Sequence, residues 1–364
     1  MSRSFFYKLF PPPSFLTMPT SGVDISDESI HIAEIEKVSN GCIVKKYGKR
    51  KIPKGVIESG RIKNVPELKK IFTQIRKEEG LRFVNVSLPE QHGYVVTMRI
   101  PKMKQSEIYG NLELNIEEHV PILAKDAVID YDIVQVGKND EEKVFIELNV
   151  SVYPKEIIEE YMEVFKGTGI TPLCFEIEAY SVARAVIPKG DKGTFMILDF
   201  GKTRTGVTIA SREVVHFTST LNIGGDILTQ AIARNFSISF DEAENLKKKK
   251  SFLVREDGNR DLLLALLPTI SALTGEVNKH YQYWNTHKNP FGKEHQKIDS
   301  LLLCGGLSNL AGFSDYLSTN IHVDVSVANV FKNINSFENY IPEIPFEESL
   351  QYATSIGLAL SSNK

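Results

Sequence analysis

Two short apolar strands that each carry an aspartate constrain the fold of this chain most strongly. The first is residues 23–25 (VDI), within the run GVDISDESIHIAE, and the second is residues 197–199 (ILD), within ILDFGKTRTGVT. In both places a turn follows the aspartate, and a second strand with alternating apolar residues comes next. The pattern predicts two β-hairpins of similar design, each presenting one carboxylate, in an α/β protein.

The composition fits a folded protein with more than one domain. The chain has 364 residues, of which 42% are hydrophobic and 24% are charged, and its formal net charge is −3. A chain of this length exceeds what a single core usually holds. The slightly acidic balance argues against a nucleic-acid-binding protein, which needs a basic excess. No apolar run approaches the roughly 18 residues that a transmembrane helix needs.

The cysteines and histidines do not predict a metal centre. Cys42, Cys174 and Cys304 are far apart, and the histidines form no HExxH spacing. We therefore expect no zinc site and reduced, core-filling cysteines. At the N-terminus, residues 1–20 contain SFFYKLF followed by three prolines, which favour an extended arm. This arm is either a partly ordered tail or an aromatic contact for a membrane or a partner.

Hydrophobic periodicity divides the rest of the chain into two α/β domains. The first is predicted over residues 21–190, and residues 88–153 within it have their own helix and hairpin and form an inserted subdomain. The second is predicted over residues 191–347 with a helical insertion at about 228–297, and residues 348–364 form a C-terminal helix that returns to the first domain. The individual helices expected along the chain are 65–80, 106–119, 154–168, 227–236, 241–250 with Asp241 as N-cap, 262–287, 309–317 and 348–360.

The two hairpins have the residue types of a phosphate site. Their candidate binding residues are Asp24, Ser26, Asp199, Gly201, Thr203 and Thr205. Gly201 permits a positive φ and lets backbone N–H groups approach an anion, and the threonines supply hydroxyls. Asp24 and Asp199 are placed to hold one Mg²⁺ through water. Two such hairpins facing each other would clamp a polyphosphate, although each segment alone is also compatible with an ordinary hairpin.

A third apolar strand ends in a glycine pair, Gly305-Gly306, in the run LLLCGGLSNLAG. The glycines would let a flat ligand approach the backbone, and a helix starting near Ser308 would add affinity for an anion. The run has no GKS or GKT and no GxGxxG, so it is neither a Walker loop nor a dinucleotide fingerprint.

Two further segments complete the set. NIGGD places Gly225 at the start of a helix, and EAENLKK places Glu244 and Lys247 on one helix face. The lysine run 247–250 is also compatible with a solvated helix face.

The order of these segments resembles the actin, Hsp70 and sugar-kinase superfamily, in which they are the phosphate-1, phosphate-2 and adenosine motifs. The insertion and the AENLK helix are similar to those of the cell-division protein FtsA and of the type IV pilus assembly family PilM. The runs RIPKM, NIEEHVPI, DYDIV, EIEAYSVARA and LQYATSIGLAL resemble the PilM family in particular. The resemblance covers nearly the whole chain from Ser21 onward.

This resemblance implies an actin-like (ribonuclease H-like) two-domain ATPase fold with an FtsA/PilM-type inserted subdomain, and ATP and Mg²⁺ as ligands. The residues expected on the adenosine side are Glu244, Lys247, Gly305, Gly306 and Ser308, and Gly225 is a further nucleotide-binding candidate. Glu178, in EIEAY, stands where relatives carry the residue that orients the attacking water; a helix-capping acid is the alternative. Ser26 stands where such proteins usually have glycine, so weak or no ATPase activity is expected.

The resemblance also implies a cytoplasmic scaffold of a type IV pilus assembly machine. Its expected partners are the N-terminal cytoplasmic tail of a PilN-like inner-membrane protein and other pilus assembly proteins. The tail would bind between the first domain and the inserted subdomain and keep the protein peripheral to the inner membrane. Two alternatives stay open. One is a small-molecule kinase, although residues 60–102 show no acid-rich cluster for a substrate. The other is an FtsA-like membrane-associated filament protein, although no amphipathic extension follows Leu360.

Overall fold

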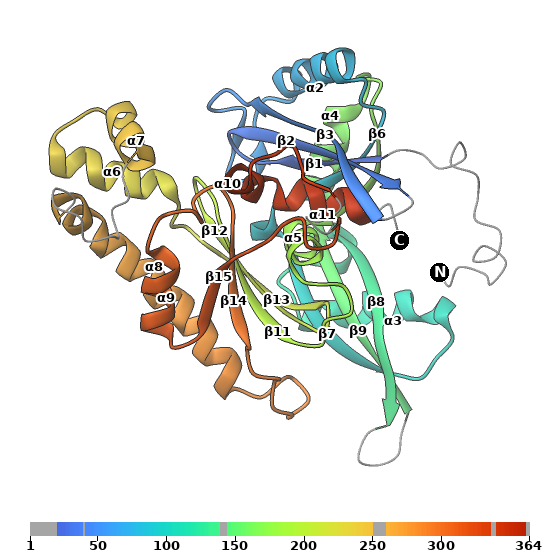
Figure 1. The fold of residues 1–364 in the computed structure, drawn as a ribbon. Helices are drawn as coiled ribbons and strands as arrows, with labels where there is room; N and C mark the ends of the chain where they lie inside the picture. Colours follow the sequence, from blue (N-terminus) through green and yellow to red (C-terminus); the bar gives the residue numbers. More distant parts are fainter. Residues whose placement is uncertain (1–19, 39–40, 139–143, 250–259, 336–339, 362–364) are drawn as a thin grey trace.

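The computed structural model describes residues 20–38, 41–138, 144–249, 260–335 and 340–361. Residues 1–19 of the expected N-terminal arm, Lys250 and residues 362–364 lie outside the described part, whereas Thr20 already belongs to the first strand. The described residues form an α/β protein with mixed sheets (Figure 1), as predicted.

Two five-stranded sheets of the same topology form the two halves. The first has the order β10-β6-β1-β2-β3, with β1 at Thr20–Ile25, β2 at Ser29–Val38, β3 at Gly41–Lys51, β6 at Phe83–Leu88 and β10 at Thr171–Ile177. The second has the order β13-β12-β11-β14-β15, with β11 at Thr194–Phe200, β12 at Thr205–Ser211, β13 at Val214–Leu221, β14 at Ser300–Cys304 and β15 at Asp324–Val327. In each sheet the three strands that come first in the chain pair antiparallel: β1 with β2 and β2 with β3, and β11 with β12 and β12 with β13. The two later strands, β6 and β10 or β14 and β15, run parallel to the central strand β1 or β11. The aspartate-bearing strands β1 and β11 are therefore the central strands.

Helices of the first half follow from local signals and from close packing. Helix α2, Val65–Glu79, begins at Asn64, whose side chain accepts the Glu67 N–H, and ends at Gly80 in a left-handed conformation. The remaining helices are α4, Lys155–Phe165, α5, Glu178–Val186, and α11, Ala353–Ser361. Short elements complete this half: β4, Ile57–Glu58, β5, Arg61–Ile62, and the 3₁₀ turn η2, Glu90–His92.

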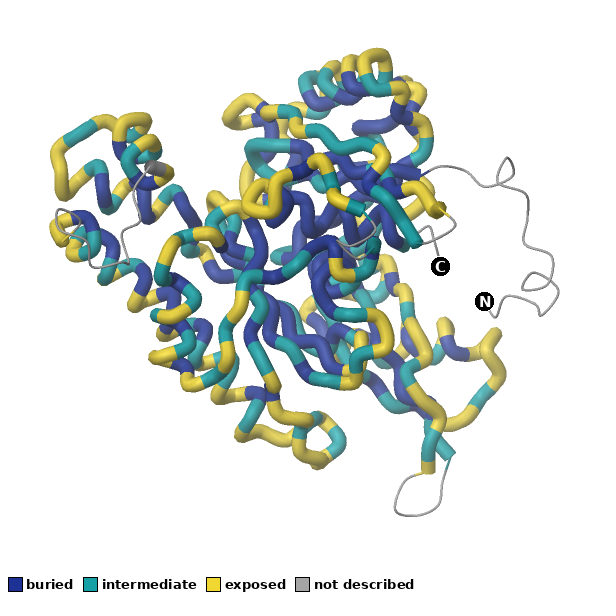
Figure 2. The backbone as a smooth tube through the Cα atoms, viewed as in Figure 1, coloured by how far each residue is buried: buried dark blue, intermediate teal, exposed yellow. Residues whose placement is uncertain are grey.

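The final helix, α11, lies against β1 and α5 although it comes last in the sequence. A Cβ on Gly22 would lie 1.9 Å from the Ser355 carbonyl oxygen, and one on Gly357 would lie 1.8 Å from that of Ser181. Both positions therefore need glycine, because the backbones themselves touch. Figure 2 shows that the buried residues concentrate where these elements meet the two sheets.

A three-stranded antiparallel sheet, ordered β7-β9-β8, forms the inserted subdomain. Its elements are β7 at Tyr94–Pro101, α3 at Gln105–Asn115, η3 at Ile116–Glu118, η4 at Ala124–Asp126, β8 at Ala127–Lys138 and β9 at Val144–Pro154. The subdomain has a core of its own around Leu112 and Leu148. Leu88, the first residue of the expected insertion, ends β6 and pairs with Ile177 in the first sheet. The expected helix 106–119 ends early, at Asn115, and continues as a 3₁₀ turn.

The second half contains α6 at Gly225–Phe236, α7 at Phe240–Lys249, α8 at Arg260–Thr286, α9 at Phe313–Ile321, α10 at Phe346–Ser349 and the turn η5 at Leu350–Tyr352. Asp241 is not the N-cap of α7. That role belongs to Ser239, whose hydroxyl accepts the Glu242 N–H at 3.3 Å while its own N–H bonds the Glu242 carboxylate at 2.9 Å. Helix α9 begins at Phe313 and not at Asn309, because turns occupy the residues after the glycine pair.

Candidate functional site

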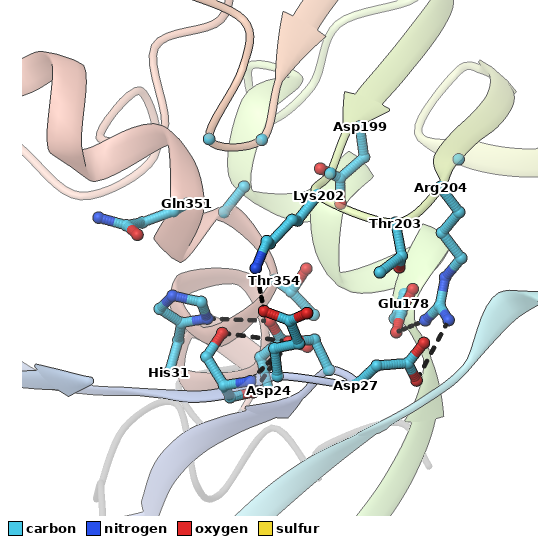
Figure 3. A pocket seen from close by; sticks show the side chains of 18 of the residues that line it. Asp24, Asp27, His31, Glu178, Asp199, Lys202, Thr203, Arg204, Gln351 and Thr354 are labelled. Atoms are coloured by element: carbon cyan, nitrogen blue, oxygen red, sulfur yellow. Dashed lines mark hydrogen bonds and ion pairs between the residues drawn. The ribbon is translucent and has the colours of Figure 1, made fainter. Parts of the chain in front are cut away.

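A cleft of about 500 Å³ lies between the two halves and is lined by both aspartate hairpins. Figure 3 shows the side chains that enter it from β1, α5 and the β11–β12 turn. Of the sequence-predicted residues, those that line it are Asp24, Ser26, Glu178, Asp199, Gly201, Thr203, Glu244, Gly305 and Gly306. Thr205, Gly225, Lys247 and Ser308 are not among the lining residues.

Asp24 is held in place by the neighbouring parallel strand and by β2. The Ser87 hydroxyl donates to Asp24 Oδ1 at 2.9 Å and accepts the Ile25 N–H at 3.1 Å. His31 Nδ1 lies 3.5 Å from Asp24 Oδ2 on the other side. The carboxylate is therefore pre-oriented at the floor of the cleft.

Asp199 lies in the same position on the central strand of the second sheet. Burial raises the pKa of Asp199 to about 6, the nearby Asp24 charge adds to this, and Arg204 opposes it. Gly305 has a φ of +89°, and a Cβ there would lie 2.4 Å from Asp199 Oδ1. The first glycine of the pair thus makes room for the aspartate.

The two hairpin turns are rigid, but they are built differently from what their sequences predict. The Ser26 hydroxyl donates to the Ser29 carbonyl at 2.9 Å and accepts the Ser29 N–H at 3.2 Å, so it closes its own turn. Gly201 permits a positive φ but does not adopt one. Its N–H lies 3.1 Å from the Asp199 carbonyl and 3.0 Å from that of Arg204, and a Cβ would meet the latter at 3.0 Å. Thr203 reaches the cleft, whereas Thr205 is buried and donates to the Ile223 carbonyl at 2.5 Å.

Arg204, which the sequence analysis did not single out, organises the acidic floor. Its guanidinium lies 3.3 Å from Glu178 Oε1 and 3.8 Å from Asp27 Oδ1 (Figure 3). Burial raises the pKa of Glu178 to about 8 in spite of Arg204, and the carboxylates of Asp24 and Asp199 contribute to the rise. Glu178 does not cap α5, because the N-cap is Ile177 and no side-chain capping bond is formed.

Glu90 is a second cleft residue that the sequence analysis missed. It follows β6 directly, is buried, and lines the cleft, where its Oε1 has no hydrogen-bond partner. Burial holds its pKa well above the ordinary range, and the charges of Glu178 and Asp199 raise it further, although an N–H bond from Ser219 acts the other way. No clear signal in the sequence marks Glu90, because its burial beside acids that are distant in the chain cannot be read from local charge or spacing.

Lysines surround the mouth of the cleft above these acids. The lysines that line it are Lys49, Lys51, Lys54, Lys202 and Lys248. Lys202 bridges the halves through an ion pair with Glu28, and Lys49 donates to Gln351 Oε1 at 2.6 Å. A basic rim over an acidic floor suits a polyphosphate that carries a divalent cation.

The donor set fits a hydrated Mg²⁺ better than a direct protein cage. Within the described residues no group of three or more His, Cys, Asp or Glu side chains is arranged to hold a metal ion by itself. A cation between Asp24 and Asp199 would complete its shell with water and ligand oxygens, which is the coordination that Mg²⁺ prefers.

The expected adenosine residues divide between the cleft and the interior. A Cβ on Gly306 would meet nothing closer than 4.0 Å, so this glycine leaves open space at the cleft wall. Lys247 is not on a solvated face: its side chain is 2% exposed and bonds the Gly225 carbonyl, Thr229 and Glu244. The Ser308 hydroxyl bonds the Cys304 carbonyl, and turns follow the glycine pair, because α9 begins only at Phe313. Lys248, one residue further along α7, faces the cleft instead.

The model of the family described as type IV pilus assembly protein PilM matches residues 22–363. The chain belongs to the PilM family. A PilM–PilN type IV pilus biogenesis complex is similar in structure, with a TM-score of 0.78, 20% identity, and coverage of 96% of this chain and 99% of the other. The PilM fold expected from the resemblance is thereby confirmed.

More distant solved structures have the same actin-like fold. Ethanolamine utilization protein EutJ from Carboxydothermus hydrogenoformans matches with a TM-score of 0.56 and 16% identity, over 95% of this chain and 92% of the other. MreB5 of Spiroplasma citri bound to ADP matches with a TM-score of 0.55 and 12% identity, over 94% and 96%. No helix among the described residues of this PilM family member is long and apolar enough to span a bilayer.

Proposed function

We propose that this chain is an ATP-binding scaffold of a type IV pilus assembly machine, which binds the cytoplasmic N-terminal tail of a PilN-like inner-membrane protein. The observation that carries the proposal is the placement of Asp24 and Asp199 on matching central strands at one cleft. Family membership and the similarity to a PilM–PilN complex support the partner. Binding through such a tail would keep the protein peripheral to the inner membrane.

We infer the following roles for the residues that line the cleft. Asp24 and Asp199 would hold Mg²⁺ through water, and the Thr203 hydroxyl and Lys202 would contact phosphate oxygens. Mg²⁺, when bound, supplies positive charge between the triphosphate and the two carboxylates. The open wall at Gly306 would take the base or ribose, with Glu244 on the opposite side.

Slow or undetectable hydrolysis is expected from the state of Glu178. A carboxyl group with a pKa of about 8 is mostly protonated at neutral pH and is a poor acceptor for a water proton. The Arg204 guanidinium also contacts one of its carboxyl oxygens, which is then less available to a water molecule. The triphosphate would then persist as a ligand that organises the cleft.

The partner surface is proposed at two open sheet edges. Strand β10 is the outer strand of the first sheet and β8 is the outer strand of the inserted sheet. Strand β10 leads directly into α5, and Ser151 of β9 bonds Tyr180 of α5, so the first sheet and the inserted sheet meet in this region. The exposed apolar side chains on them are Val128, Ile133, Val136 and Leu173. An extended peptide could add main-chain bonds there and bury its apolar side chains.

The test is a titration of a PilN-like tail peptide with and without Mg-ATP, alongside a phosphate-release assay. We expect ATP to tighten peptide binding and the peptide to tighten ATP binding by the same factor. Multiple turnover faster than about one per second, typical of a metabolic enzyme, would contradict the scaffold role.

The nucleotide role is tested separately by Asp199→Ala. Charge-assisted bonds of about 1.5–3 kcal/mol each predict a roughly tenfold or greater loss of Mg-ATP affinity. Asp324→Ala, at an exposed position of β15 in the same sheet, is the matched control and should bind normally. Unchanged calorimetric affinity in Asp199→Ala would remove this residue from the site.

A further inference from the structure

One buried amide side chain joins the inserted subdomain to both halves of the molecule. Asn149 lies on β9 and is 3% exposed. Its Nδ2 donates to the Val215 carbonyl of β13 at 2.7 Å, and its Oδ1 accepts the Tyr180 hydroxyl of α5 at 2.5 Å. Ser151, two residues along β9, donates to the same Tyr180 oxygen at 2.9 Å.

Tyr180 lies in the same first turn of α5 as Glu178. Glu178 in turn contacts Arg204, which belongs to the turn between β11 and β12 at the cleft. A ligand that changes the contact between Glu178 and Arg204 therefore acts on the helical turn that carries the Tyr180 hydroxyl. The cleft is thus connected to the subdomain by the contact between Glu178 and Arg204, the first turn of α5, and the hydrogen bond from Tyr180 to Asn149.

A second point of the subdomain, at Arg99, contacts the second half. The Arg99 guanidinium of β7 lies 4.4 Å from the ring centroid of Phe145 and 3.7 Å from that of Phe291, which belongs to the segment between α8 and β14. Glu147 fixes the orientation of Arg99 by a bond of 2.7 Å to its Nε. A guanidinium stacked on aromatic rings is attracted to their faces, so this contact holds the two segments together. A change in the angle between the halves would thus pull on the subdomain at Arg99 and at Asn149, while Tyr180 ties it to the first half.

We propose that Asn149 and Tyr180 are positioning residues through which the occupancy of the cleft sets the position of the inserted subdomain, and with it the affinity for the partner peptide. The inference rests on the proposed function and adds the mechanism of its regulation. The physical element that would carry the coupling is the subdomain itself, because it is bonded to both halves.

The decisive variant is Tyr180→Phe, which removes one hydroxyl and leaves the ring. The measured quantity is the ratio of peptide dissociation constants without and with Mg-ATP. Couplings between sites are typically about 5–150-fold, and we expect the variant to bring the ratio at least about threefold closer to one. The affinity for Mg-ATP alone should change by less than about twofold, because Tyr180 does not line the cleft.

Tyr161→Phe is the matched control. Its hydroxyl is also buried and donates to the Gly60 carbonyl at 3.1 Å, but both residues belong to the first half. Each variant loses one buried hydroxyl and its hydrogen bond, so the two should lose similar amounts of stability. A merely structural role for Tyr180 would therefore give the two variants the same stability loss and the same wild-type ratio.

A second variant, Phe291→Ala, tests the inference away from the buried junction, at a partly exposed position that tolerates truncation. It too should lower the ratio, because it releases the subdomain from the second half. A wild-type ratio in both variants overturns the inference and leaves the scaffold proposal standing. If the wild-type protein binds neither ATP nor the peptide, or if its two peptide dissociation constants are equal, the proposed coupling is wrong. The inference is then wrong as well.

Discussion

At the scale of single residues, the adjacent glycines after β14 do different work. Gly305 has a positive φ and its missing side chain leaves space for the Asp199 carboxylate, whereas Gly306 leaves space for something outside the protein. Their roles cannot be told apart in the sequence, because both read simply as flexible residues after an apolar strand.

This difference predicts that Gly306→Val blocks nucleotide binding without unfolding the protein. The valine would fill open cleft space and meets no fixed backbone. Gly305→Ala is the contrasting change, because it clashes with Asp199 and strains the turn, and it should lower stability as well. Nucleotide titration and urea unfolding of both variants check this; normal ATP binding by folded Gly306→Val would place the ligand elsewhere.

Glu178 gives a prediction for pH. Burial raises its pKa in the folded protein from 4.5 to about 8, with further help from Asp24 and Asp199. Between these values the unfolded chain has lost the proton and the folded protein has kept it, so this group lowers stability as pH rises from about 5 to 8. Glu178→Gln does not titrate and should gain stability relative to wild type over the same range. Urea unfolding at both pH values measures the gain; an equal difference at pH 5 and pH 8 would show that the carboxyl group is ionised throughout.

At the scale of elements, hydrophobic periodicity predicted most strands and helices. The residues at which helices begin were harder to predict, because they depend on hydrogen bonds that the periodicity does not show. Ser308 looked like the start of a helix, yet its hydroxyl bonds the Cys304 carbonyl and α9 begins only after Gly312, which has a φ of +82°. Arg204 and Glu90 were missed for a related reason. Their importance comes from burial beside acids that are distant in the sequence, and charge and spacing along the chain carry no sign of it.

The close contact between α11 and α5 predicts how stability responds to a larger residue at Gly357. Gly357→Ala would place a Cβ 1.8 Å from the Ser181 carbonyl oxygen, so the two helices must separate. Misfit in a core costs roughly 1–3 kcal/mol and occasionally more. Gly275→Ala, in α8, meets nothing within 4 Å and should instead stabilise by about 0.4–1 kcal/mol. Urea unfolding of the two variants should show opposite signs; a stable Gly357→Ala protein would mean that the helices are not in backbone contact.

At the scale of the whole molecule, the repeated sheet topology explains why the two aspartates meet. The sequence hinted at the repetition through its two acid-bearing hairpins, and the shared strand order places both acids on central strands. What the sequence could not give is the set of contacts across the cleft. Lys202 and Arg204 of the second half form such contacts with acidic side chains of the first half.

Because few ion pairs bridge the halves within the described part of the chain, a ligand that contacts both should stabilise the molecule as a unit. At a free concentration of about one hundred times the dissociation constant, Mg-ATP should add about 2.7 kcal/mol to the free energy of unfolding. The urea midpoint measures this, and Asp199→Ala at the same Mg-ATP concentration should shift less. A midpoint that does not move with Mg-ATP in the wild-type protein would contradict nucleotide binding at the cleft.

The contact of α11 with β1 has a consequence for how the chain is made. Synthesis proceeds from the N-terminus, and domains generally fold as they emerge. Here the face of the first sheet at Gly22 is covered by Ser355 and its neighbours, so that face stays bare until nearly the whole chain has left the ribosome. The second half can close its own core earlier, since its sheet and helices span a continuous stretch. The half that is made first is therefore the half that is finished last.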